Sequence, residues 1–61
     1  MDAITLKQKR ITLEATQSEL AAALHVTARQ VINWERGKHP VPFLVEHFIN
    51  QMIVRKLNDI R

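Results

Sequence analysis

The 61-residue chain contains no cysteine, one glycine and two prolines. The absence of cysteine excludes disulfides, thiolate nucleophiles and cysteine-based zinc sites. The sequence also has no uncharged run approaching the roughly 20 residues that span a bilayer, and no basic leader precedes an apolar run at its N-terminus. We therefore expect an intracellular protein without a membrane partner.

Residues that carry catalysis or bind metals are few and poorly spaced. His25, His39 and His47 lack the i, i+4 spacing of metal ligands on one helix face. Ser18 is the single serine, no known motif places a histidine and an acid beside it, and the chain has no glycine-rich phosphate loop. We expect no enzymatic activity, no metal, no cofactor and no small-molecule ligand.

Charge and length favour a small domain with an anionic partner. Nine lysines and arginines against six acidic residues give a formal net charge of +3, which is a weak indication of a nucleic-acid partner. A chain of this length buries only about 60% of the surface that its unfolded form exposes. We expect one all-α domain over residues 1–61, with a thin core and a homodimer formed through leftover apolar surface.

Two capping boxes predict a helix-turn-helix over about residues 16–35. In a capping box, a threonine hydroxyl accepts a hydrogen bond from the backbone amide three residues later, and the side chain of that later residue accepts one from the threonine amide. Two segments fit this pattern, Thr16-Gln17-Ser18-Glu19 and Thr27-Ala28-Arg29-Gln30. They lie eleven residues apart, which leaves about three residues for the turn. An earlier helix is predicted from the spacing of Ala3, Leu6, Arg10 and Leu13, with Asp2 as its N-cap.

The C-terminal segment predicts a long apolar helix over about residues 42–60. Gly37 suits a helix end, residues 39–42 must be extended or turn-like, and Pro42 suits the first helical position. The following apolar stripe is broad enough to leave a surface for a second chain, and the alternative is a break near Asn50 that gives two short helices. The stripe consists of Leu44, Val45, Phe48, Ile49, Met52, Ile53, Leu57 and Ile60, among which Phe48, Met52, Ile53 and Leu57 are the candidates for dimerisation.

The outward face of the helix after the turn carries chemistry suited to reading DNA bases. At 100° per residue, Ala28, Arg29, Ile32 and Asn33 lie opposite Val31 and Trp34. Arginine can bond guanine O6 and N7, asparagine can bond adenine N6 and N7, and alanine or isoleucine can contact a thymine methyl group. The alternative is that Arg29 and Asn33 are ordinary surface residues and Ile32 packs on the last helix.

Several motifs between Leu6 and Lys38 together carry a family resemblance. They are Arg10, the Thr16-Gln17-x-Glu19-Leu20-Ala21 start of a helix, Val26-Thr27 at the turn, Val31, and Trp34-Glu35-Arg36-Gly37-Lys38. This half of the chain resembles the DNA-binding domain of the lambdoid phage repressors and Cro proteins, the Xre/Cro helix-turn-helix family. The resemblance implies a lambda-repressor-like fold of four or five helices that binds the major groove of double-stranded DNA.

The resemblance also implies roles for individual residues. Base contacts would come from Arg29 and Gln30 together with Ala28, Ile32 and Asn33, although the capping box also requires the Gln30 amide. Gln17 would hold a phosphate with its side chain and backbone amide at a helix N-terminus. The other phosphate contacts would be Thr27, Arg36 and Lys38, with Lys7 and Lys9 as weaker candidates because surface lysines are commonly only solvated.

Arg10 provides an independent check, because it lies in the apolar stripe of the first helix, where an unpaired charge is costly. The family pattern pairs this arginine with the glutamate after the tryptophan, here Glu35. The alternative is an arginine whose stem reaches along the surface to water.

Three residues depart from the family pattern. His25 stands at a turn position where the family usually has glycine, and histidine is one of the few other residues that tolerate positive φ. We expect a turn residue, with pH sensing or phosphate contact as the alternative. Lys9 and Glu14 stand where leucine and glycine are common, which leaves the packing of the first helix open.

These observations predict a Cro-type repressor of the bacterial cytoplasm, with a phage or prophage as a candidate source. It would bind a palindromic operator as a homodimer, with recognition helices about 34 Å apart. One alternative is an autorepressor of a small operon, of the antitoxin or anti-CRISPR-associated type. Another is a protein-interaction module that captures a partner helix on its C-terminal stripe.

Overall fold

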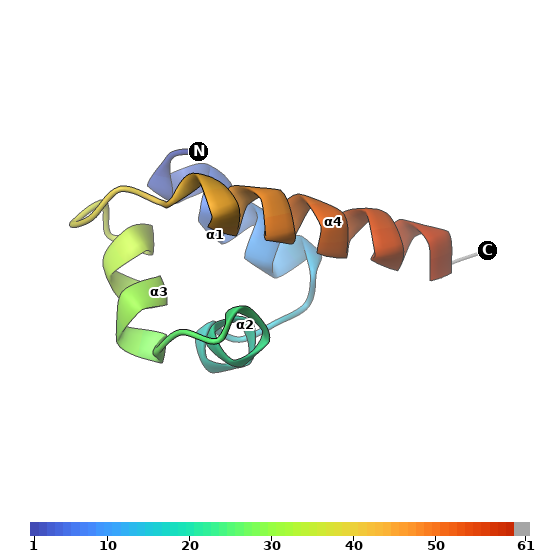
Figure 1. Ribbon diagram of the computed structural model, residues 1–61, viewed down its shortest axis with the longest axis horizontal. Helices are drawn as coiled ribbons and strands as arrows, with labels where there is room; N and C mark the ends of the chain where they lie inside the picture. The colour runs from blue at the N-terminus through green and yellow to red at the C-terminus, as the bar shows by residue number, and fades with distance from the viewer. Residues whose placement is uncertain (60–61) are drawn as a thin grey trace.

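The computed structural model describes residues 1–59 and consists of four α-helices without a β-strand in that range (Figure 1). Helices α2 and α3 pack against each other, and α1 packs against both α3 and α4. In Figure 1, α4 runs along the long axis of the molecule, and its C-terminal turns extend beyond the other helices. The all-α prediction is confirmed with four helices, α1 (Ala3–Thr12), α2 (Gln17–Leu24), α3 (Ala28–Glu35) and α4 (Phe43–Asp59).

The starts of the first three helices follow from side-chain caps. The Asp2 carboxylate accepts a hydrogen bond of 2.7 Å from the Thr5 amide, and both predicted capping boxes are present, at Thr16 with Glu19 and at Thr27 with Gln30. Hydrogen bonds from Thr5 hold the pKa of Asp2 below its ordinary value, and those from Thr16, chiefly from its backbone amide, do the same for Glu19. Each cap satisfies amides that the first turn of a helix leaves free.

The same three helices end in left-handed residues, namely Glu14 (φ 57°), His25 (φ 58°) and Gly37 (φ 74°). At each end two amides return to carbonyls of the last turn, as Val26 does to Ala21 (3.0 Å) and His25 to Ala22 (3.2 Å). This pair of backbone hydrogen bonds is the Schellman motif, in which glycine is the usual left-handed residue. Only one of the three positions is glycine, and the structure confirms His25 as a turn residue with positive φ.

Replacing His25 by glycine is expected to raise the free energy of unfolding by about 1 kcal/mol, because glycine removes the steric cost of the left-handed conformation. Chemical denaturation of the purified variant measures the change. His25→Val is the matched control and should lower stability, since a β-branched residue tolerates this region poorly. A less stable glycine variant would mean that the imidazole itself contributes favourable contacts at the end of α2.

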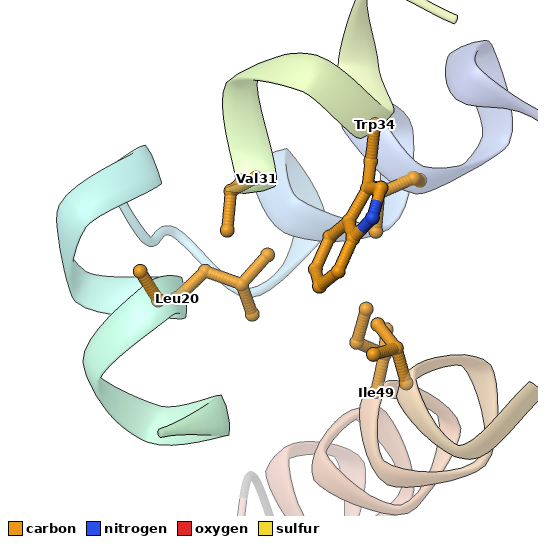
Figure 2. Close-up of a cluster of buried hydrophobic side chains, with 7 residues drawn as sticks. Leu20, Val31, Trp34 and Ile49 are labelled. Carbon is orange, nitrogen blue, oxygen red and sulfur yellow. The ribbon is translucent and has the colours of Figure 1, made fainter. Parts of the chain in front are cut away.

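The core lies between α3 and the other helices. Its buried side chains surround Trp34, whose indole ring points from α3 toward Leu20 and Ile49 in Figure 2. Because Val31 and Trp34 occupy the inward face of α3, the opposite face of this helix is directed to solvent. The buried cluster consists of Leu6, Leu20, Ala21, Val31, Trp34, Val45 and Ile49.

Helix α4 is continuous through Asn50, so the single-helix prediction is confirmed and the break near Asn50 is wrong. Pro42 does not occupy the first helical position but precedes it, and its carbonyl accepts hydrogen bonds from the amides of Val45 (3.1 Å) and Glu46 (3.3 Å). Ile60, which the apolar pattern assigned to this helix, lies outside the described residues.

Two of the four dimerisation candidates face inward. Met52 and Ile53 are half-buried and pack against the core, whereas Phe48 and Leu57 are 51% and 62% exposed. The broad stripe is therefore buried along its middle and exposed at its two edges, where Phe48 and Leu57 project from opposite sides of the helix. The reason is that α1 covers only one side of α4.

Candidate DNA-binding surface

The solvent-facing side of α3 holds the predicted base-contact residues in a short surface strip. Arg29 and Gln30 are exposed, and Ile32 and Asn33 are half-buried. Ala28 is also half-buried and packs against the core, which leaves its methyl group less accessible than its neighbours. The strip thus offers a guanidinium, two amides and one apolar side chain.

The turn before α3 fixes the Gln30 side chain. The side-chain oxygen accepts hydrogen bonds from the Thr27 backbone amide (3.0 Å) and from the Thr27 hydroxyl (3.4 Å). The backbone amide of Gln30 donates to the same hydroxyl (3.2 Å). The capping box predicted from the sequence is present, so Gln30 has the structural role that competes with base contact. The amide nitrogen is the part of the side chain that this box does not use.

A partly buried polar network joins α1, α2 and α3 behind the strip. The Arg10 guanidinium donates two hydrogen bonds to the Glu35 carboxylate, at 2.6 and 3.0 Å, and a third to the Ala15 carbonyl at 3.0 Å. The Arg10 and Glu35 side chains are only 14% and 5% exposed. The ion pair expected between them is therefore present, and its hydrogen bonds raise the pKa of Arg10. It fixes the C-terminal end of α3 on α1.

Gln17 has a second role that the sequence did not reveal. Its side-chain amide donates a hydrogen bond of 3.3 Å to Glu35, in the same network as Arg10. The expectation that this side chain holds a phosphate therefore competes with an internal contact, and the backbone amide at the N-terminus of α2 is the freer donor. No local pattern indicates this bond, because its partners are 18 residues apart.

The lysines and arginines predicted to contact phosphate divide into exposed residues and one that bonds another helix. Arg36 and Lys38 are exposed just after α3, where the Lys38 amide closes the helix end on the Asn33 carbonyl at 2.9 Å. Lys7 is exposed on α1. Lys9 instead donates a hydrogen bond of 2.5 Å to the Asn50 side chain of α4, so its ammonium group joins two helices.

Other kinds of site find no support in the described part of the chain. Residues 1–59 contain no group of three or more histidine, cysteine or acidic side chains arranged to hold a metal ion. Among the described helices, none combines the length and the apolar character required to cross a membrane.

Comparison with known proteins agrees with this geometry. A family model described as helix-turn-helix matches residues 6–43, which extend from α1 through the turn and α3 to the first residue of α4. No curated protein and no solved structure matches the chain significantly. The matched segment covers more than half of the 61 residues and contains Arg10, both capping boxes and the strip on α3. The chain therefore belongs to the Xre/Cro-type helix-turn-helix family and is a DNA-binding regulator.

Proposed function

We propose that the protein is a Cro-type repressor that binds a palindromic operator as a homodimer. The observation that carries this proposal is the outward strip of α3, where Arg29 and Asn33 flank the half-buried Ile32. In the major groove, the arginine would bond a guanine, the asparagine an adenine, and the isoleucine a thymine methyl group. Repression would follow from occupancy, because a bound dimer covers DNA that the transcription machinery needs.

Phosphate contacts would position α3 in the groove without reading sequence. The amide of Gln17 lies at the N-terminus of α2, where free N–H groups and the helix dipole favour an anion. The exposed Arg36 and Lys38 would contact the backbone after α3, whereas Thr27 at the turn would have to release its hydroxyl bond to Gln30 to take part. Lys7 is a further candidate, whereas Lys9 would have to leave Asn50 to take part.

The homodimer would form on the exposed side of α4 that carries Leu44 and Phe48. Leu44 and Phe48 are 64% and 51% exposed there, whereas Leu57, which is 62% exposed, projects from the opposite side of the helix. A groove between the end of α2 and α4 is lined by Phe48 with Ala23, Leu24 and Met52, and by the polar side chains His25, Gln51 and Arg55. A half-exposed aromatic ring at the wall of a groove suits a two-fold contact, in which each chain offers the same patch. The same face would serve a partner helix if the protein were an interaction module.

Replacing Phe48 by aspartate is expected to weaken self-association at least about tenfold, because a charge would replace an aromatic anchor at the centre of the interface. Affinity for a full operator should fall, while affinity for a single half-site should not change. Sedimentation equilibrium and DNA titration measure the two effects. Ile4→Asp is the matched control, since Ile4 is 71% exposed on α1. Equal association of both variants would place the interface elsewhere.

Selection of bound sites from random duplex DNA at about 0.15 M salt tests the proposed function. An inverted repeat with half-sites about one helical turn apart is the expected result. Enrichment of no sequence, together with binding that disappears steeply as salt is raised, would mean that charge alone holds DNA. Such an outcome with a monomeric chain would favour the interaction module.

A further inference from the structure

The oxygen of the Gln30 side chain is held inside the capping box at the start of α3. It accepts one hydrogen bond from the Thr27 amide at 3.0 Å and another from the Thr27 hydroxyl at 3.4 Å. A carbonyl oxygen has two lone pairs, of which the amide bond takes one and the longer hydroxyl contact faces the other. The identity of this atom follows from chemistry, because the Thr27 amide is a donor and requires an acceptor opposite it.

The exposed part of Gln30 is therefore an NH2 group with two donors and no acceptor. An adenine read in the major groove requires one acceptor for its N6 amino group and one donor for its N7. Gln30 cannot make that pair of bonds while its oxygen stays in the capping box. Guanine, with O6 and N7, and thymine, with O4, offer acceptors alone at the corresponding edge.

We propose that Gln30 is a donor-only specificity residue, which selects guanine or thymine over cytosine at one position of each operator half-site, and over adenine, whose N7 acceptor lies beside an amino group that is itself a donor. This inference rests on the proposed function. Gln30 is exposed in the first turn of α3, the part of a recognition helix that contacts base edges. Its neighbour Arg29 also carries donors only. Adjacent positions of the half-site therefore present acceptors to this turn, and bidentate recognition of adenine falls to Asn33.

Gln30→Glu is the informative variant, because it removes the donors and keeps the cap. The chain already contains the equivalent arrangement in α2, where the Glu19 carboxylate accepts the Thr16 amide at 2.8 Å and the Glu19 amide donates to the Thr16 hydroxyl at 3.0 Å. The start of α3 should therefore form in the variant as it does in the wild-type chain. Thermal unfolding of both proteins checks this.

The test uses the operator obtained by selection and all single base-pair changes of one half-site. The wild-type protein is expected to prefer guanine or thymine at one position by about tenfold. Gln30→Glu is expected to lose that preference or to prefer cytosine, whose amino group can donate a hydrogen bond to the carboxylate. In a second measurement on the wild-type protein, the preferred base is replaced by an analogue that lacks one acceptor, namely 7-deazaguanine, which lacks N7, or 5-methyl-2-pyrimidinone, which lacks O4. A similar loss is expected at that position.

Three outcomes would overturn the inference. If Gln30→Glu weakens binding to every sequence by one factor and the salt dependence changes, Gln30 contacts a phosphate and not a base. If the wild-type protein prefers adenine at the position that Gln30→Glu affects, the capping box opens on DNA. If the wild-type protein discriminates at no position, the proposed function itself fails. The first two outcomes leave the repressor proposal intact.

Discussion

Replacing Arg10 by alanine is expected to lower the free energy of unfolding by about 3–5 kcal/mol, because it leaves the buried Glu35 carboxylate without its cation. The Glu35 side chain is 5% exposed, and it would lose two guanidinium hydrogen bonds, at 2.6 and 3.0 Å. The Ala15 carbonyl also loses a partner. A domain of this size has a stability of only a few kcal/mol. The variant should therefore be largely unfolded at 37 °C, which circular dichroism would measure.

Two further variants separate the contribution of the pair from that of charge. Glu14→Gln is the matched control, since its ion pair with Lys56 at 2.9 Å involves a carboxylate that is 81% exposed, and its effect should be far smaller. Arg10→Met combined with Glu35→Leu should restore much of the stability, because no buried charge is then unpaired. Equal losses for Arg10→Ala and Glu14→Gln would contradict a structural role for the buried pair.

Replacing Arg29 by alanine is expected to cost about 1–3 kcal/mol of operator affinity and to relax the preference at one base pair, because the guanidinium would provide a bidentate contact to guanine. Arg29 is exposed on the outer face of α3, so its removal should leave folding unchanged. Titration of the variant against the operator and its single base-pair changes measures both the loss and its position.

Lys38→Ala is the matched control for Arg29→Ala. It also removes one exposed positive charge, but from the segment after α3. It should therefore weaken binding to all sequences and lower the slope of log affinity against log salt concentration by about one. A loss from Arg29→Ala that is equal for every operator variant would show that this residue contacts phosphate. The assignment of the α3 strip to base reading would then be wrong.

The beginning of each early helix could be predicted because its signals are local. Thr16 with Glu19 and Thr27 with Gln30 lie three residues apart, and the bonds between them form within one helical turn. The apolar spacing similarly placed Val31 and Trp34 inside, so the outward strip of α3 followed from the sequence. The residue type at position 14 did not predict its left-handed conformation, because glutamate rarely adopts it. The only indication was that the family commonly has glycine at this position.

Local signals were not sufficient to predict which side of α4 faces the core. Its apolar residues are spread over most of the helix circumference, so periodicity did not decide which of them face the core. The structure buries Val45 and Ile49 and partly buries Met52 and Ile53, because α1 lies on that side. The groove beside Phe48 also arises from tertiary packing, since the end of α2 forms its other wall.

The sequence by itself therefore determined the helices, their caps, the outward strip of α3 and the pairing of Arg10 with Glu35 through the family pattern. The tertiary structure alone decided that Gln17 bonds Glu35, that Lys9 bonds Asn50 and that half of the dimerisation candidates face inward. The physical reason is the range of the interactions. Caps and periodicity act over three or four residues along one helix, whereas these contacts join residues brought together only when different helices pack.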